Sequence, residues 1–142
     1  MQEANFDLKL EQILAQDKRY AREAYVFVRE ALDFTQKLVL RENPGSLRHH
    51  VSPQELLDGI RQFALQQFGP MAATVFEEWG VTRCSDFGEI VFNMVEVSLL
   101  AITEKDSRDD FQNGYDFADA FKKPYLPKSR SEAETGIEAK TK

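Results

Sequence analysis

The sequence has one cysteine and two histidines, and this shortage excludes several kinds of site. Cys84 alone cannot form an internal disulfide or a zinc site built from cysteines, and a lone thiol fits a reducing compartment. His49 and His50 are neighbours, and adjacent side chains on an extended segment point in opposite directions, so they form no chelating pair. We therefore expect no metal and no cofactor, and a loop or capping role for both histidines.

Long apolar runs are also missing from the chain. No stretch of about 18 apolar residues occurs, so no transmembrane helix and no membrane association are expected. The first five residues lack the basic and apolar regions of a secretory signal. Together with the single cysteine, these absences predict a cytoplasmic protein.

Familiar catalytic motifs are absent as well. The sequence contains no G-x-G-x-x-G, no P-loop and no G-x-S-x-G. Acidic neighbours such as Glu77-Glu78 and Asp109-Asp110 could act as acid and base only with burial or a partner that shifts their pKa, and consecutive charges usually face solvent. We therefore predict no catalytic residues, and a protein that is not an enzyme is the favoured interpretation.

The composition is that of an ordinary globular domain. The chain is 42% hydrophobic and 30% charged, which is typical of a globular protein. Its length of 142 residues is enough for one hydrophobic core and too short for two domains. We expect a single helical domain over residues 1–126 and a flexible polar tail over residues 127–142. The chain has a net charge of −6, and because residues 127–142 carry +1, the remainder carries −7, which argues against nucleic acid as a partner.

Three periodic apolar segments follow one another between residues 51 and 100. Ser52, Pro53 and Glu55 form the signature of a capped helix start, and Gly69-Pro70 marks its end. A shorter apolar face runs from Met71 to Gly80. A third helix is predicted to begin at Asp86, with Glu89 as its capping partner, and to end near Leu100.

Two further helices are expected before this region. Residues 1–16 have spacing that allows a short helix. A longer amphipathic helix is predicted from Asp17 to about Arg41, followed by a turn at Asn43-Pro44-Gly45-Ser46. None of these helices can bury its apolar face alone, so the sequence predicts a mainly α, multi-helix domain.

The segment after Leu100 allows two interpretations. The first is a small C-terminal β-hairpin with strands near 99–104 and 114–118. The second is an irregular arm whose aromatic side chains enter the helical core, which is where aromatic residues at this density usually lie. The candidate partner-docking residues are the four aromatics of this arm: Phe111, Tyr115, Phe117 and Phe121.

Three helices followed by a hairpin is the order of a winged helix. That fold would make Asp86 to Val97 the recognition helix and residues 101–117 the wing. The outward positions of this helix would be Asp86, Glu89, Asn93 and Glu96. A phosphate backbone repels three of those four side chains, so a winged-helix-like core here points to a protein partner rather than to DNA.

Several segments, taken in order, resemble an uncharacterised family of small proteins from planctomycete and verrucomicrobial bacteria. They are Lys18-Arg19-Tyr20, Ala24 to Val28, His50-Val51-Ser52, Gln54 to Leu57, Phe68 to Ala72, Glu78 to Val81, Asp86 to Asn93, and Tyr115-Asp116-Phe117. The resemblance spans about residues 6 to 126 and implies a bacterial cytoplasmic protein. The family has no established activity, so no catalytic or binding residue carries over.

The favoured function is a non-enzymatic protein-interaction domain that binds a protein partner or a second copy of itself. One alternative is a winged-helix DNA-binding regulator, which would need a contiguous positive face. Another is a small-ligand-binding protein or enzyme, which would need an enclosed pocket with convergent polar groups, with Tyr25, His50 and Asn93 as the candidates.

Overall fold

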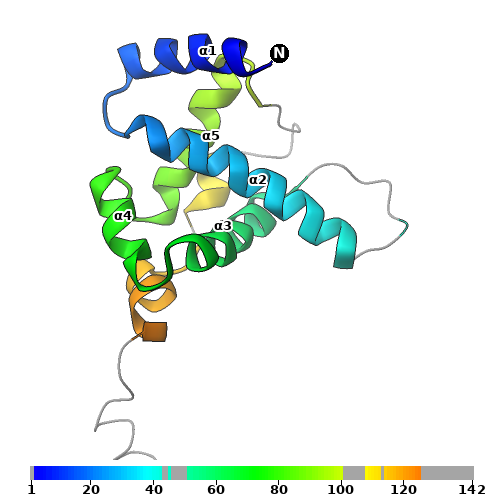
Figure 1. The fold of residues 1–142 in the computed structure, drawn as a ribbon, viewed down its shortest axis with the longest axis vertical. Coiled ribbons are helices and arrows are strands. Elements are labelled where there is room, and N and C mark those ends of the chain that lie inside the picture. Colours follow the sequence, from blue (N-terminus) through cyan, green and yellow to red (C-terminus); the bar gives the residue numbers. More distant parts are fainter. Residues whose placement is uncertain (1, 43–44, 46–50, 101–107, 113, 126–142) are drawn as a thin grey trace, which may run out of the picture.

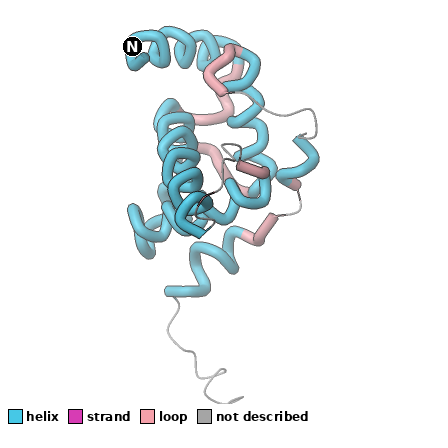
Figure 2. Tube along the Cα trace, turned by 90° about the vertical axis from the view of Figure 1, so that its right-hand side faces the viewer, coloured by secondary structure: helices cyan, strands magenta, loops and turns pink. Residues whose placement is uncertain are grey.

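Helices make up most of the described part of the chain, as the sequence predicts (Figure 1). The computed structural model describes residues 2–42, 45, 51–100, 108–112 and 114–125. Its elements are α1 (Gln2–Gln16), α2 (Arg22–Glu42), α3 (Pro53–Phe68), η1 (Gly69–Met71), α4 (Ala72–Glu78), α5 (Cys84–Glu96), η2 (Arg108–Phe111), η3 (Ala118–Lys122) and η4 (Lys123–Tyr125). Figure 2 shows no strand among these residues. The predicted tail, residues 127–142, lies outside the described residues.

The α1 helix agrees with the prediction for residues 1–16, but α2 begins later than Asp17. The Asp17 carboxylate accepts a hydrogen bond from the backbone N–H of Arg19 at 3.0 Å. Such a bond from an aspartate to the backbone two residues on favours a turn over a helix. The chain therefore turns over residues 17–21, and α2 starts at Arg22.

The predicted capping box of α3 is present. Ser52 accepts from the Glu55 backbone N–H at 3.1 Å, and Glu55 accepts from the Ser52 N–H at 3.0 Å. Pro53 occupies the first turn, and the helix ends at Phe68 with Gly69 as its C-cap. The predicted start of the third helix is wrong by two residues: α5 begins at Cys84, and Asp86 lies inside its first turn.

The α2 and α3 helices cross closely beneath α1, with α5 behind α2 (Figure 1). At the crossing, buried Thr35 lies against Gly59. A Cβ on Gly59 would sit 1.7 Å from the Thr35 hydroxyl oxygen, so only glycine permits this approach. The crossing brings the apolar stripes of both helices into one core, which also includes side chains from α1, α4, α5 and η3.

The predicted hairpin is not found among the described residues. Residues 101–107, which would form most of its first strand, lie outside the described residues. The second predicted strand, 114–118, is irregular up to Asp116 and helical from Phe117 onward. The Asp116 carboxylate accepts from the backbone N–H groups of Ala118 (2.8 Å) and Asp119 (3.2 Å), which starts a helical turn at this point.

Candidate functional site

The four aromatics predicted to dock a partner are packed against the helices. Phe111 is 2% exposed and Phe121 is 0% exposed, while Tyr115 and Phe117 are half-buried. Phe121 contacts the Phe76 ring at a centroid distance of 5.1 Å. The second interpretation of this segment, an arm whose aromatic side chains enter the core, is the arrangement found. Phe111 and Phe121 therefore present almost no surface to a partner, whereas Tyr115 and Phe117 each keep a partly exposed side chain.

The contacts of this arm explain its burial. Phe111 packs directly on Gly88 of α5, where a Cβ would lie 2.8 Å from the Phe111 Cβ. Tyr115 donates its hydroxyl hydrogen to the Leu57 carbonyl oxygen at 2.8 Å, so its polar end is satisfied while its half-buried ring packs against the core. Phe117 stacks on Phe87 with centroids 5.7 Å apart. The arm thus closes the core beneath α3 and α5.

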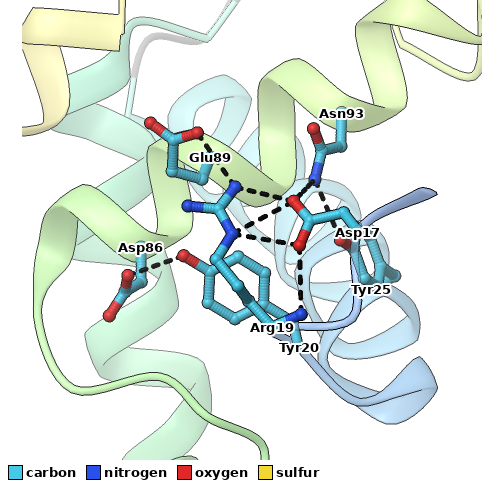
Figure 3. A network of polar contacts seen from close by, with 7 residues as sticks. All are labelled: Asp17, Arg19, Tyr20, Tyr25, Asp86, Glu89 and Asn93. Atoms are coloured by element: carbon cyan, nitrogen blue, oxygen red, sulfur yellow. Dashed lines mark hydrogen bonds and ion pairs between the residues drawn. The ribbon is translucent and has the colours of Figure 1, made fainter. Parts of the chain in front are cut away.

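A polar network joins the turn between α1 and α2 to α5 (Figure 3). The Asp17 carboxylate accepts from the Arg19 guanidinium at 2.6 Å and from the Asn93 amide at 2.9 Å. The same amide nitrogen donates to the Tyr25 hydroxyl oxygen at 3.0 Å. Arg19 also reaches Glu89 at 3.3 Å. The Asp17 carboxylate is therefore held by Arg19 of its own turn and by Asn93 of α5.

A second hydrogen bond strengthens this join. Tyr20 donates to Asp86 Oδ1 at 2.6 Å, and Asp86 Oδ2 accepts from the Thr82 and Arg83 backbone N–H groups at 2.9 and 3.3 Å. A carboxylate in the first turn of a helix also interacts favourably with the helix dipole. Asp86 therefore both caps α5 and anchors Tyr20.

The electrostatics of this network do not suit acid–base catalysis. The Arg19 guanidinium beside Asp17 holds the pKa of that carboxyl well below its usual range, although burial opposes the shift. Burial raises the pKa of Tyr20 and of Tyr25 above the ordinary tyrosine value. A general base works best with a pKa near the operating pH, and these groups are shifted away from neutrality. We interpret the network as structural.

The sequence-predicted pocket residues are brought together only in part. Tyr25 and Asn93 are hydrogen-bonded to each other, but Tyr25 is fully buried and Asn93 is engaged with Asp17. His50 lies outside the described residues. On the outward face proposed for a recognition helix, Asp86, Glu89 and Asn93 all contact the loop of their own chain.

Other reactive groups in the described residues also appear in structural roles. Cys84 is 3% exposed and donates to the Tyr115 carbonyl oxygen at 3.4 Å, and burial raises the pKa of its thiol to about 11. A thiol with so high a pKa is a weak nucleophile at neutral pH. No group of three or more metal-ligating side chains lies together in this part of the chain. No helix there is long and apolar enough to cross a bilayer.

The surface feature that stands out is a hollow of about 300 Å³ between α2, the end of α3 and the end of α4. Its apolar walls are Val26, Phe27, Phe63, Phe68 and Trp79, and we call it the aromatic groove. Four ring pairs line it, Phe27–Phe63, Phe27–Phe68, Phe27–Trp79 and Phe68–Trp79, with centroids 5.3 to 5.7 Å apart. All of these side chains except Phe27 are only half-buried.

The rim of the aromatic groove is acidic. Arg22 lies there, but its guanidinium is paired with Asp7 at 2.6 Å and with Glu11 at 3.0 Å. Glu23 and Glu30 are exposed at the same rim, and neither has an ion-pair partner within the described residues. An apolar hollow edged by two free carboxylates favours a ligand with an apolar group and positive charges beside it.

Sequence reasoning missed the aromatic groove, although it placed these aromatics on helices. Phe27, Phe63, Phe68 and Trp79 all fall on the predicted apolar stripes, and a stripe does not say which of its members remain partly exposed. The one available signal was the number of aromatic residues near the ends of two consecutive predicted helices. A narrow contact between two helices cannot bury the whole surface of so many large side chains.

Comparisons with known proteins gave no match. Neither protein-family models, nor curated proteins, nor solved structures match this chain significantly. The resemblance to the uncharacterised bacterial family therefore stays a prediction, and the function is argued from the structure alone.

Proposed function

We propose that this protein is a protein-interaction domain whose aromatic groove binds an apolar segment of a partner protein flanked by lysine or arginine residues. The observation that carries the proposal is the half-buried aromatic wall edged by Glu23 and Glu30. Aromatic side chains at a surface are typical anchors of protein interfaces, since they bury much area at low entropic cost. In this proposal the domain acts in the cytoplasm and is not an enzyme.

The shape of the groove favours a protein partner over a small ligand. The hollow lies at the lower end of the volume range of ligand pockets, which is about 300 to 1,000 Å³. Three of its polar lining residues, Glu23, Glu30 and Gln67, are exposed. The network around Asp17 does not open into it. This arrangement suits an inserted side chain of a larger partner.

The winged-helix regulator is the less supported alternative. Three side chains of the α5 face that would read DNA are held by the chain's own loop, and two of them are acidic. The segment that would form the second wing strand turns into a helix at Phe117. Affinity for DNA depends on cations that face phosphates, and the rim of the groove offers free carboxylates instead.

Site-specific photo-crosslinking tests the proposal. Benzoylphenylalanine replaces Gln67, which lines the groove, or its neighbour Gln66, which is exposed outside it. After irradiation in the cells that make the protein and nuclease treatment of the lysate, mass spectrometry identifies the crosslinked peptides. We expect crosslinks from position 67 but not 66, to peptides with an apolar residue between lysines or arginines.

Charge variants supply the matched control. The double variant E23K/E30K should abolish these crosslinks, whereas D33K, on an exposed part of α2 that does not line the groove, should retain them. Circular dichroism and urea unfolding establish that each variant remains folded. Identical crosslinks from positions 66 and 67, no crosslink specific to position 67, or binding that disappears with nuclease would each overturn the proposal.

A further inference from the structure

The two carboxylates at the rim of the aromatic groove have a defined spacing. Glu23 and Glu30 both line the groove from α2, and both are exposed. They are about two helical turns apart, so they lie on the same side of α2 with about 10 Å between them along its axis. Val26 and Phe27 lie between them in the sequence and form part of the apolar wall. A ligand that meets both carboxylates therefore needs two positive charges at about this distance, with apolar groups between them.

The groove also contains hydrogen-bond donors that have no partner. Trp79 and Gln67 line the hollow, and neither the indole N–H nor the side-chain amide forms a hydrogen bond with another group in the described part of the chain. An indole N–H at an apolar contact usually pairs with an acceptor. The groove therefore offers two donors to the acceptors of a ligand.

These donors favour one backbone conformation for a bound segment. In an α-helix the carbonyl oxygens accept from the N–H groups of the same helix. A β-strand would need a sheet edge to pair with, whereas the elements that border the groove, α2, α3 and α4, are helices. A polyproline II segment has no internal hydrogen bonds, so its carbonyl oxygens are free to accept from Trp79 and Gln67. Aromatic-lined grooves are also the usual binding sites of such segments.

The spacing of the two carboxylates agrees with the dimensions of a polyproline II helix. This helix rises about 3.1 Å per residue and has about three residues per turn. Two of its residues three positions apart therefore lie on the same side, about 9 Å from each other. That distance is close to the separation of Glu23 and Glu30 along α2, and the two residues between the charges face the aromatic walls.

We propose that the partner segment is a proline-containing stretch in the polyproline II conformation that lies along α2. Two lysine or arginine residues three positions apart meet Glu23 and Glu30, and a proline between them contacts the aromatic walls. This inference rests on the proposed function and adds the conformation of the segment and the spacing of its charges.

Selection from a peptide library tests this inference on the full chain. The probe is a displayed library of 12-residue peptides with every position randomised. Binders selected on the wild-type protein are counted as groove-dependent when E23K/E30K removes their binding and D33K does not. Among groove-dependent binders, we expect lysine or arginine at two positions three apart, with proline between them. Proline interrupts a helix, so such peptides cannot bind as helices.

Single charge reversals then test which cation meets which carboxylate. In E23K and in E30K the affinity of a selected peptide should fall about tenfold. Glutamate in place of one of the two peptide cations should restore binding to E23K only, and glutamate in place of the other should restore binding to E30K only. The control D33K, which does not line the groove, should leave the affinity unchanged.

Removal of the donors tests the role of the peptide's carbonyl oxygens. W79F keeps an aromatic ring and removes the indole N–H, and Q67A removes the amide. Each should lower the affinity of the selected peptides about fivefold. The matched control Q66A truncates an exposed glutamine outside the groove and should have no effect. Circular dichroism establishes that each variant remains folded.

The outcomes separate this inference from the proposed function. Groove-dependent binders that lack proline between their cations, or whose cations are seven positions apart as a helix requires, overturn the inference and leave the proposed function standing. Groove-dependent binders that respond to neither W79F nor Q67A do the same. A failure to obtain any groove-dependent binder overturns both.

Discussion

The aromatic cluster around Phe76 and the polar network around Asp17 both join distant parts of the chain, but by different physical means. Phe76 is fully buried and its ring contacts Phe27, Phe87 and Phe121, among others. Asp17 contacts Arg19 and Asn93 through directed hydrogen bonds. Burial of apolar area has no preferred direction, whereas hydrogen bonds require a particular geometry.

The two regions therefore contribute to the fold in different ways. The aromatic cluster brings α2, α4, α5 and η3 together within the core. The polar network decides how the turn at residues 17–21 lies on α5. The backbone confirms this close fit: Gly80, with φ +85°, approaches the Arg19 carbonyl so closely that a Cβ would lie 2.3 Å from that oxygen. The comparison predicts large stability effects in the aromatic cluster and smaller, pH-dependent ones in the network.

The largest effect is expected for F76A. Truncation of a fully buried phenylalanine removes its apolar contacts and leaves a cavity, at a cost of about 4 kcal/mol in the free energy of unfolding. Urea denaturation followed by circular dichroism measures this loss. The control L8A truncates a side chain that is 67% exposed and should cost less than about 0.5 kcal/mol. Similar costs for the two variants would contradict the placement of Phe76 at the centre of the core.

An intermediate effect is expected for D17N. Because the pKa of Asp17 is lower in the folded protein than its ordinary value near 4, the carboxylate contributes stability above that pH, and this contribution is lost as the pH falls below about 4. At pH 7 the variant should lose about 2 kcal/mol in the free energy of unfolding.

Urea denaturation at several pH values checks this expectation. The gap in stability between the wild type and D17N should begin to narrow as the pH falls from 5 towards 3, through the ordinary aspartate pKa of about 4. It should close only at lower pH, because the pKa of Asp17 in the folded protein lies well below that value. The control D33N, at an exposed position without a hydrogen-bond partner in the described residues, should follow the wild type throughout. A constant gap between D17N and wild type at all pH values would show that the charge of Asp17 contributes nothing.

The smallest effect is expected for Y25F. The variant keeps the buried ring and removes the hydroxyl that accepts from Asn93, so we expect a loss of about 1 kcal/mol in the free energy of unfolding. A double-mutant cycle with N93A measures the interaction between the two side chains. If Y25F costs the same with and without Asn93, the hydrogen bond in the network contributes no coupling energy.

The sequence by itself determined the helices wherever their signals are local. The Ser52–Glu55 capping box and the stop at Gly69 involve residues within one turn of the helix ends, and both are present in the structure. The same holds for the mainly α class, since the apolar periodicity is a property of each segment alone. The start of α2 was missed because it depends on the partners of the Asp17 carboxylate, which accepts from the Arg19 backbone N–H two residues on and from Asn93, a residue 76 positions away.

Tertiary structure alone decided which aromatic side chains face solvent. The docking residues predicted from sequence, such as Phe111 and Phe121, are buried, while Phe68 and Trp79 remain partly exposed in the aromatic groove. The sequence pattern does not distinguish the two pairs, because all four are aromatic residues in segments predicted to contribute side chains to the core. Their exposure depends on the areas covered by every neighbouring element, and those neighbours come from distant parts of the chain. Local pattern therefore specifies the elements, and only the sum of long-range contacts specifies the surface that a partner meets.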